Sequence, residues 1–165
     1  MNIKELSKMN YSEFVGFVDE RNRPSGGIKT VHEVAVNSFI DSTKKILEIG
    51  SNTGFTSVNL NLLTGCEVIG VETNKPSIIK AQLYAGQNNI TNKVSFVHAD
   101  AQKLPFDDST FDLVWCSNVT SFVDKKSDVI SEYLRVLKLG GTLVVIPIYY
   151  AKEPSNNLIT AVSEA

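Results

Sequence analysis

The stretch Ile46-Leu47-Glu48-Ile49-Gly50-Ser51-Asn52-Thr53-Gly54-Phe55-Thr56-Ser57 decides the fold of this chain. An apolar run that carries one acid, Glu48, ends at Gly50, and after a short polar turn and Gly54 the residues favour a helix. Both glycines tolerate positive φ and leave room for another molecule beside the backbone, and Asn52 between them is the next most tolerant residue type. The stretch therefore predicts a strand, a tight turn and a helix, with the acid near the strand end where parallel sheets bind ligands.

Two nucleotide-binding patterns do not fit this turn. Counted from Gly50, a dinucleotide fingerprint of the form G-x-G-x-x-G needs glycine at the positions of Asn52 and Phe55. A phosphate-binding loop needs lysine directly after its last glycine, and Gly54 is followed by Phe55. The turn therefore either holds a different ligand or connects the strand to the helix without one.

The composition predicts one globular domain and disfavours several kinds of partner. Of the 165 residues, 42% are hydrophobic and 21% are charged, which suits a single core. A net charge of -2 without a basic run disfavours nucleic acid. Cys66 and Cys116 lack metal-ligand spacing, so we expect buried free thiols and no metal site. With no apolar run of about 20 residues and no signal peptide, we expect no membrane contact and a cytoplasmic location.

Residues 1–44 are predicted to form a helical cover in two pieces around a loop. Apolar residues recur at helical spacing within 10–18, and a second helix is expected to bury one face, made of Val31, Val34, Ala35, Phe39 and Ile40. The loop between them places Arg21 and Arg23 beside the flexible pair Gly26 and Gly27. Such a loop can close as a lid over a bound carboxylate, although loops of this kind are more often linkers with solvated arginines.

From Lys45 onward, strand and helix patterns alternate. Strands are expected at 46–49, 68–72, 94–98, 111–116 and 142–148, and helices at 55–63, from Pro76 to about Gly86, and at 126–137. This alternation predicts an α/β fold with a mostly parallel sheet in the order 3-2-1-4-5 and helices on both faces. The inward faces of the last two helices are expected to carry Ile78, Ile79, Leu83 and Ala85, and Val129, Ile130, Tyr133, Leu134 and Leu137.

Two more acids follow the next strands. A right-handed crossover brings Glu72, at the end of the second strand, beside the glycine turn, where its carboxylate can accept both hydroxyls of a ribose. Asp100 follows the third strand and can accept a hydrogen bond from an adenine amino group, while Ala101 offers a backbone amide to the ring. The alternative roles are an exposed strand-end acid for Glu72 and a turn cap for Asp100.

In this order and spacing, these residues resemble the successive motifs of the class I (Rossmann-like) S-adenosylmethionine-dependent methyltransferases. Glu48, Gly50 and Gly54 match the first motif, in which Asn52 replaces the middle glycine. The later segments of the resemblance, which runs from about 45 to 148, are Glu72, Asp100-Ala101, Leu104-Pro105-Phe106 with Phe111 to Val114, and Leu134 to Gly141, where Leu139 replaces the usual proline.

The resemblance implies a cofactor-binding domain over 45–165 that takes S-adenosylmethionine and releases S-adenosylhomocysteine. It implies that Glu48 and the glycine turn hold the methionine part, that Glu72 holds the ribose, and that Asp100 and Ala101 hold the adenine. Ser51, Asn52 and Asn118 are further cofactor contacts that it implies. The motifs of DNA-methylating enzymes are missing after the fourth strand, so a small-molecule acceptor is expected.

Direct SN2 methyl transfer asks mainly for placement of the acceptor, and for a base only where the acceptor carries a proton. His32, in the cover, is the weak candidate for such a base, whereas His98 is interpreted as a packed residue or an edge residue. Tyr149 and Tyr150 are expected to line an acceptor pocket, although paired tyrosines at a strand end are commonly amphipathic packing.

The family adds a sixth and a seventh strand after the fifth, and this sequence instead shows Pro154 opening a last short helix. The fifth strand is therefore expected to leave an exposed edge, which a second copy or a partner chain would cover. A non-catalytic, cofactor-binding regulatory subunit is the alternative to an enzyme. A nicotinamide oxidoreductase ranks third, because the glycine spacing fails.

Overall fold

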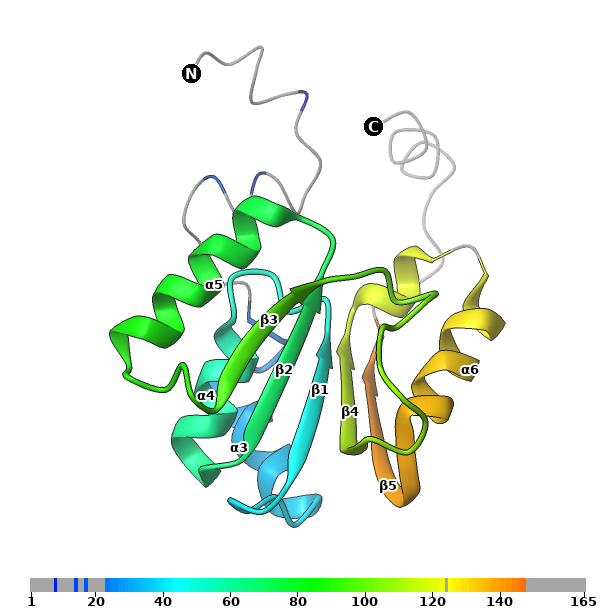
Figure 1. The fold of residues 1–165 in the computed structure, drawn as a ribbon, viewed down its shortest axis with the longest axis horizontal. Coiled ribbons are helices and arrows are strands. Elements are labelled where there is room, and N and C mark those ends of the chain that lie inside the picture. The colour runs from blue at the N-terminus through cyan, green and yellow to red at the C-terminus, as the bar shows by residue number, and fades with distance from the viewer. Residues whose placement is uncertain (1–7, 9–13, 15–16, 18–22, 124, 148–165) are drawn as a thin grey trace.

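The computed structural model describes residues 8, 14, 17, 23–123 and 125–147. The predicted helix within 10–18, the helix after Pro154, and Arg21, Tyr149 and Tyr150 lie outside these residues. The elements in chain order are α3 (Ile28–Asn37), β1 (Lys45–Ile49), α4 (Phe55–Thr64), β2 (Glu67–Glu72), α5 (Lys75–Gln87), β3 (Val94–His98), β4 (Phe111–Ser117), the 3-10 helix η1 (Val119–Phe122), α6 (Lys126–Val136) and β5 (Leu137–Ile146) (Figure 1).

The strands form one five-stranded sheet in the order β3-β2-β1-β4-β5, and each neighbouring pair is parallel. The predicted fold class and strand order are confirmed. In the register, Ile49 pairs with both Val71 and Cys116, and Glu72 pairs with His98. The carboxyl ends of four strands therefore meet at one edge of the sheet, the upper edge in Figure 1.

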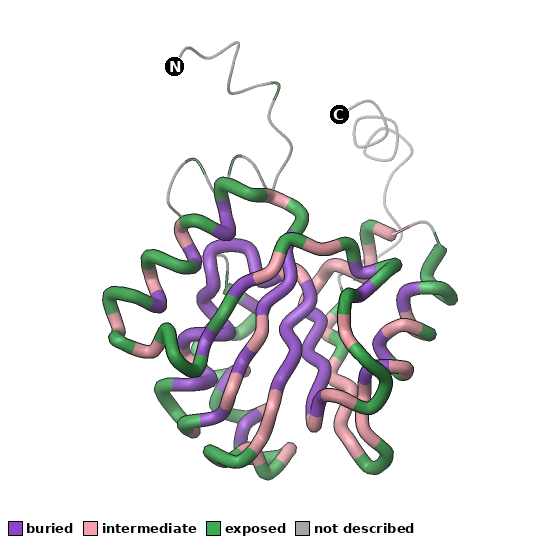
Figure 2. Tube along the Cα trace, viewed as in Figure 1, coloured by how far each residue is buried: buried purple, intermediate pink, exposed green. Residues whose placement is uncertain are grey.

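Helices cover both faces of the sheet, because successive strand residues point to opposite sides. One face packs on α3, α4 and α5 through residues such as Val31, Val58 and Trp115. The other face packs on α6 and the segment after β3, through Leu47, Val114 and Tyr133 among others. Figure 2 shows the result, with buried central strands and helices that are exposed on their outer sides.

The predicted roles of Gly65 and Pro76 at helix ends are confirmed, and the structure adds a cap at Asn74. Gly65 ends α4 in the left-handed conformation with a φ of 73°. Asn74 caps α5 by accepting a hydrogen bond from Ser77 N, and Pro76 lies in the first turn. Among the described residues, no helix combines the length and the hydropathy that a membrane span needs.

Four predicted inward residues are exposed instead, and these predictions were wrong. Phe39 (84% exposed) lies beyond the end of α3, with a φ of 51°. On α5, Ile79 and Leu83 are exposed, because the helix buries Ile78, Ala81 and Ala85. Gly54 packs closely on this helix, because a Cβ built on it would lie 3.0 Å from the Cβ of Ala81.

On α6, Leu134 is exposed, whereas Val129, Tyr133 and Val136 are buried. The helix ends at Val136, so Leu137 belongs to β5 and not to the helix. The strand then bulges, since Phe111 pairs with Leu137 but Leu113 pairs with Thr142. The predicted strand start at Thr142 is therefore the point at which regular pairing begins, and the strand ends at Ile146 rather than at 148.

Candidate functional site

The glycine turn after β1 has the left-handed geometry that the sequence predicts. Gly50, Asn52 and Gly54 have φ values of 69°, 43° and 84°. The N–H groups of Gly50 and Ser51 both donate to Val71 O, at 2.9 and 3.0 Å, which ties the turn to the end of β2. A side chain at either glycine would require a conformation that L-residues rarely adopt.

Neighbouring side chains pack closely on this turn. A Cβ on Gly50 would lie 2.1 Å from Val119 Cγ2, and one on Gly54 would lie 2.8 Å from Phe96 Cζ. Val119 begins η1, directly after the fourth strand and Asn118. No pattern in the sequence predicts the place of Val119, because its contact with Gly50 joins segments that lie far apart along the chain.

Glu48 turns inward, towards the first turn of α4. It is 5% exposed, and its Oε2 accepts hydrogen bonds from Ser57 N at 2.9 Å and from Ser57 Oγ at 2.5 Å. Burial raises the pKa of Glu48 to about 7, although the hydrogen bonds from Ser57 and Thr56 oppose this rise. Glu48 therefore links β1 to the start of α4, where helix N–H groups lack partners within the helix.

Glu72 joins the end of β2 to the glycine turn. It is 7% exposed, and its Oε2 accepts from Asn52 N at 3.0 Å. Its Oε1 accepts from Thr73 N and from Asn74 N, both at 2.9 Å. Within the described part of the chain, neither Glu72 nor Glu48 belongs to an ion pair. Backbone amides therefore fix the carboxylate of Glu72 at the predicted edge.

Asp100 lies exposed in a turn just beyond β3, at the same edge. Its Oδ1 accepts from Gln102 N at 2.8 Å, so it makes the turn-capping contact that was the alternative to a ligand contact. Ala101 beside it is buried. His98, at the end of β3, is exposed and places Nε2 2.9 Å from Thr73 O, which fits an edge residue rather than a packed one.

Several buried oxygens near the turn have no partner among the described residues. They are Ser51 Oγ in the turn, and Ser117 Oγ and Asn118 Oδ1 at the end of β4. Asn118 also has a φ of 70°, and its N–H donates to Ile146 O at 2.8 Å. A buried polar atom without a hydrogen bond costs about 1–3 kcal/mol. Polar groups of a bound molecule would remove that cost.

The predicted lid residues that the structure describes lie just before α3, and His32 lies on that helix. Arg23 is exposed, with its guanidinium carbon 5.7 Å from the ring centroid of Phe55, the residue that follows Gly54. Gly26 and Gly27 have positive φ values and lead into α3. His32 is exposed on α3, and among the described residues no hydrogen bond or ion pair joins it to the glycine turn.

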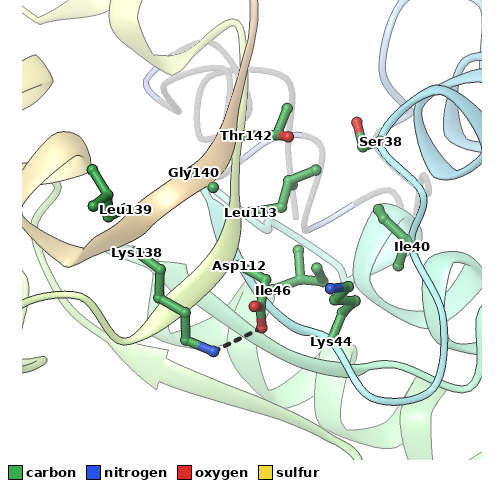
Figure 3. A pocket seen from close by; sticks show the side chains of 11 residues that line it. Ser38, Ile40, Lys44, Ile46, Asp112, Leu113, Lys138, Leu139, Gly140 and Thr142 are labelled. Atoms are coloured by element: carbon green, nitrogen blue, oxygen red, sulfur yellow. Dashed lines mark hydrogen bonds and ion pairs between the residues drawn. The ribbon is translucent and has the colours of Figure 1, made fainter.

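A cavity of about 240 Å³ lies at the opposite edge of the sheet, where β1, β4 and β5 begin (Figure 3). Lys138 points to Asp112 across it, with Nζ 3.0 Å from Oδ2. Asp112 Oδ2 also accepts from Lys45 N at 2.8 Å. The charges of Asp112 and Lys138 in this cavity are thus satisfied by each other. None of the described residues forms a group of three or more His, Cys, Asp or Glu that suits a metal ion.

Comparison with known proteins gives one family. The family model described as methyltransferase domain matches residues 47–145, which is more than half of the chain. An uncharacterized protein of Haemophilus influenzae is 36% identical over 126 residues, which cover 75% of this chain and 50% of that protein. The sterol 24-C-methyltransferase of Saccharomyces cerevisiae is 35% identical over 114 residues, which cover 69% of this chain and 30% of that enzyme.

Among solved structures, the MccD protein superposes with a TM-score of 0.80 at 25% identity. The superposition covers 87% of this chain and 63% of that one. The chain spans half or less of the length of the two sequence relatives. The match to the family model falls on the part of the chain that contains the sheet and the glycine turn.

Proposed function

This chain belongs to the class I S-adenosylmethionine-dependent methyltransferases, and on that premise we propose that it binds S-adenosylmethionine at the carboxyl edge of its sheet and directs the methyl group to a small molecule. The observation that carries the proposal is the set of buried, partnerless oxygens on Ser51, Ser117 and Asn118 around the glycine turn. A polar ligand at this edge would supply their missing hydrogen bonds. S-Adenosylhomocysteine is the expected product.

Glu72, Asp100 and Ala101 are proposed to hold the adenosine part. Among the described residues, Oε1 of Glu72 already accepts from two backbone N–H groups, whereas Oε2 accepts from Asn52 N alone. We therefore expect ribose hydroxyls to donate to Oε2, which keeps acceptor capacity. Asp100 offers a carboxylate to the adenine amino group, and Ala101 offers its backbone amide.

The turn from Gly50 to Gly54 is proposed to hold the methionine part. Its glycines leave the backbone open to close approach, and Ser51 and Asn52 supply polar side chains. Glu48 is proposed to support this part through the turn, because its Oε2 is already held by Ser57.

When bound, the sulfonium of S-adenosylmethionine supplies an activated methyl group. The chain's own residues then have to align the acceptor and keep water away, and these effects can provide most of the rate enhancement. His32 stays the weak candidate for a base, and it is exposed on α3. A base is needed only for an acceptor atom that carries a proton.

A small-molecule acceptor is supported by two observations. The relative from Saccharomyces cerevisiae is named for a sterol substrate. The net charge of -2 disfavours the polyanionic backbone of nucleic acid. Tyr149 and Tyr150 stay candidates for the acceptor pocket.

The segment from Arg21 to Gly27 is proposed to close over the methionine end. Arg23 already lies beside Phe55, the first residue of α4 and the neighbour of the glycine turn. A guanidinium there can bind a carboxylate with two hydrogen bonds. Limited proteolysis should show slower cleavage in this segment when S-adenosylhomocysteine is present, and equal cleavage would count against a lid.

A partner on β5 is proposed as well. Within the described residues, β5 pairs with β4 alone, and Val145 and Leu139 are exposed on it. An unpaired apolar edge recruits another strand, either from a second copy or from a partner chain. If a partner completes the acceptor site, the isolated chain would behave as a cofactor-binding regulatory subunit. Light scattering, with methyl-transfer assays with and without cell extract, decides this, and a monomer that methylates a small molecule unaided would refute it.

Calorimetry with S-adenosylhomocysteine and with NAD tests the proposed function. We expect the first to bind and NAD to bind far more weakly, because the turn lacks the glycines of a dinucleotide fingerprint. Tighter binding of NAD would overturn the proposal.

A further inference from the structure

The guanidinium of Arg135, at the end of α6, uses all five of its N–H donors. Nε donates to Glu132 Oε1 at 2.7 Å, and Nη2 donates to Glu132 Oε2 at 2.9 Å. Nη1 donates to Phe106 O at 2.7 Å and to Asp108 Oδ1 at 2.8 Å, and Nη2 also donates to Leu104 O at 3.1 Å. A lysine cannot reproduce this planar fork.

Glu132 and Arg135 together hold the backbone N–H and the carbonyl oxygen of Leu104. Glu132 Oε2 accepts from Leu104 N at 2.8 Å, while Arg135 donates to its carbonyl oxygen. The hydrogen bond from Arg135 lowers the pKa of Glu132 to about 2, so the carboxylate stays charged at neutral pH. Ser109 N donates to Arg135 O at 2.9 Å. Hydrogen bonds from α6 thus hold the connection between β3 and β4 at Leu104 and at Ser109.

Asp100 lies on a short link between two fixed points. On one side, β3 ends at His98. On the other side, Leu104 is buried and held by α6, and the turn between closes through Gln102 N to Asp100 Oδ1 at 2.8 Å and Lys103 N to Asp100 O at 3.0 Å. A displacement of Leu104 would therefore be passed to the carboxylate of Asp100 through three intervening residues.

We propose that Arg135 and Glu132 are positioning residues that set the placement of Asp100, and so the preference of the site for adenine over other purines. This inference rests on the proposed function, in which Asp100 accepts from the adenine amino group. Hypoxanthine carries a carbonyl oxygen at that position and leaves the carboxylate without its donor. Because Asp100 is exposed, its discrimination against a missing donor depends on how firmly the carboxylate is held in place.

The test compares S-adenosylhomocysteine with its hypoxanthine analogue, S-inosylhomocysteine, by calorimetry. We expect Arg135→Lys to lower the ratio of the two affinities about tenfold. Glu132→Gln keeps an acceptor for Leu104 N but loses the ion pair, and it should lower the ratio less. In an Asp100→Asn background, Arg135→Lys should leave the ratio unchanged, because the group that it positions is gone. Lys138→Gln, which removes the Lys138–Asp112 ion pair at the cavity, is the matched control and should leave the ratio unchanged.

The inference would be overturned if Arg135→Lys weakened both analogues by the same factor, with or without Asp100. A purely structural role of Arg135 predicts that result. If Arg135→Lys does not fold, an unchanged ratio in Glu132→Gln has the same meaning. If the unmodified chain binds neither analogue, the proposed function itself is wrong, and the inference falls with it.

Discussion

Glu48 and Asp112 lie near opposite edges of the same sheet, and their carboxyl groups respond to their surroundings in opposite ways. Burial raises the pKa of Glu48 to about 7, with Ser57 and Thr56 as its hydrogen-bond partners. Burial also acts to raise the pKa of Asp112, but Lys45 N and the Lys138 ammonium outweigh it and hold that pKa below the usual range. Burial favours the protonated form of Glu48, whereas the backbone N–H of Lys45 and the Lys138 ammonium favour the charged form of Asp112.

The two edges of the sheet also differ in whether their polar groups have hydrogen-bond partners. At the edge with the cavity of about 240 Å³, Lys138 and Asp112 satisfy each other's charges. The glycine-turn edge presents carboxylates held by backbone amides, and buried oxygens without partners. A cavity alone therefore does not mark the site in this fold, and unsatisfied polar groups beside a left-handed turn are the better sign.

The largest expected effect concerns Glu48 and pH. Its carboxyl loses its proton near pH 4.5 in the unfolded chain and near 7 in the folded chain, so the folded state binds more protons between these values. The free energy of unfolding should fall as pH rises through this range, by up to about 3 kcal/mol. Urea unfolding at pH 5 and at pH 8 measures this fall. Glu48→Gln should remove the Glu48 part of it, and identical pH profiles of the two chains would contradict the assigned burial effect.

Next in size is the effect of Glu72 on cofactor binding. Glu72→Ala should weaken S-adenosylhomocysteine binding by about 2–3 kcal/mol, because ribose hydroxyls lose a charged acceptor. Glu67 lies at the other end of the same strand and forms a surface ion pair with Lys45. Glu67→Ala should leave the calorimetric affinity unchanged. Equal losses in the two variants would erase the distinction between the edges.

The third prediction concerns the close contact between Gly50 and Val119 in the turn. Gly50→Ala should lower the free energy of unfolding by about 2 kcal/mol, because its φ is positive and its Cβ would meet Val119. Val119→Ala removes that contact, so the double variant should regain part of the loss. A double-mutant cycle in urea measures the coupling. Simple additivity would show that Val119 is not the obstacle.

The smallest effect is expected at the cavity edge. Lys138→Gln breaks an ion pair whose two side chains are partly exposed, and such pairs contribute about 0–1 kcal/mol. Thermal unfolding should therefore change little, and cofactor affinity should not change. A clear loss of affinity would make the cavity edge part of the site.

Much of the fold follows from local signals in the sequence. The left-handed turn and the ends of α4 and α5 depend on glycine and proline, which act within a few residues. The strand order follows instead from the alternation of strands and helices along the chain and from the right-handed crossover rule. The buried faces of α5 and α6 did not follow. Apolar periodicity offers Ile79 and Leu83 as readily as Ala81, and the packing of Gly54 against Ala81 is a contact that appears only after folding.

The site shows the same division. Glu72, Asp100 and the turn lie at one edge because strand ends and crossovers obey general rules. The inward turn of Glu48 to Ser57, the packing of Val119 on Gly50 and the fork of Arg135 depend on side chains that meet only after folding. Sequence spacing contains no signal for such contacts between distant segments.

Amide chemical-shift mapping during titration with S-adenosylhomocysteine tests most directly the claim that the carboxyl edge of the sheet binds the cofactor. The account predicts that the largest shifts fall on the turn from Gly50 to Gly54, on the residues after Glu72 and on Asp100 and Ala101. Residues around the cavity, such as Lys44 and Gly140, should stay unshifted. Shifts centred on the cavity, with none in the glycine turn, would contradict it.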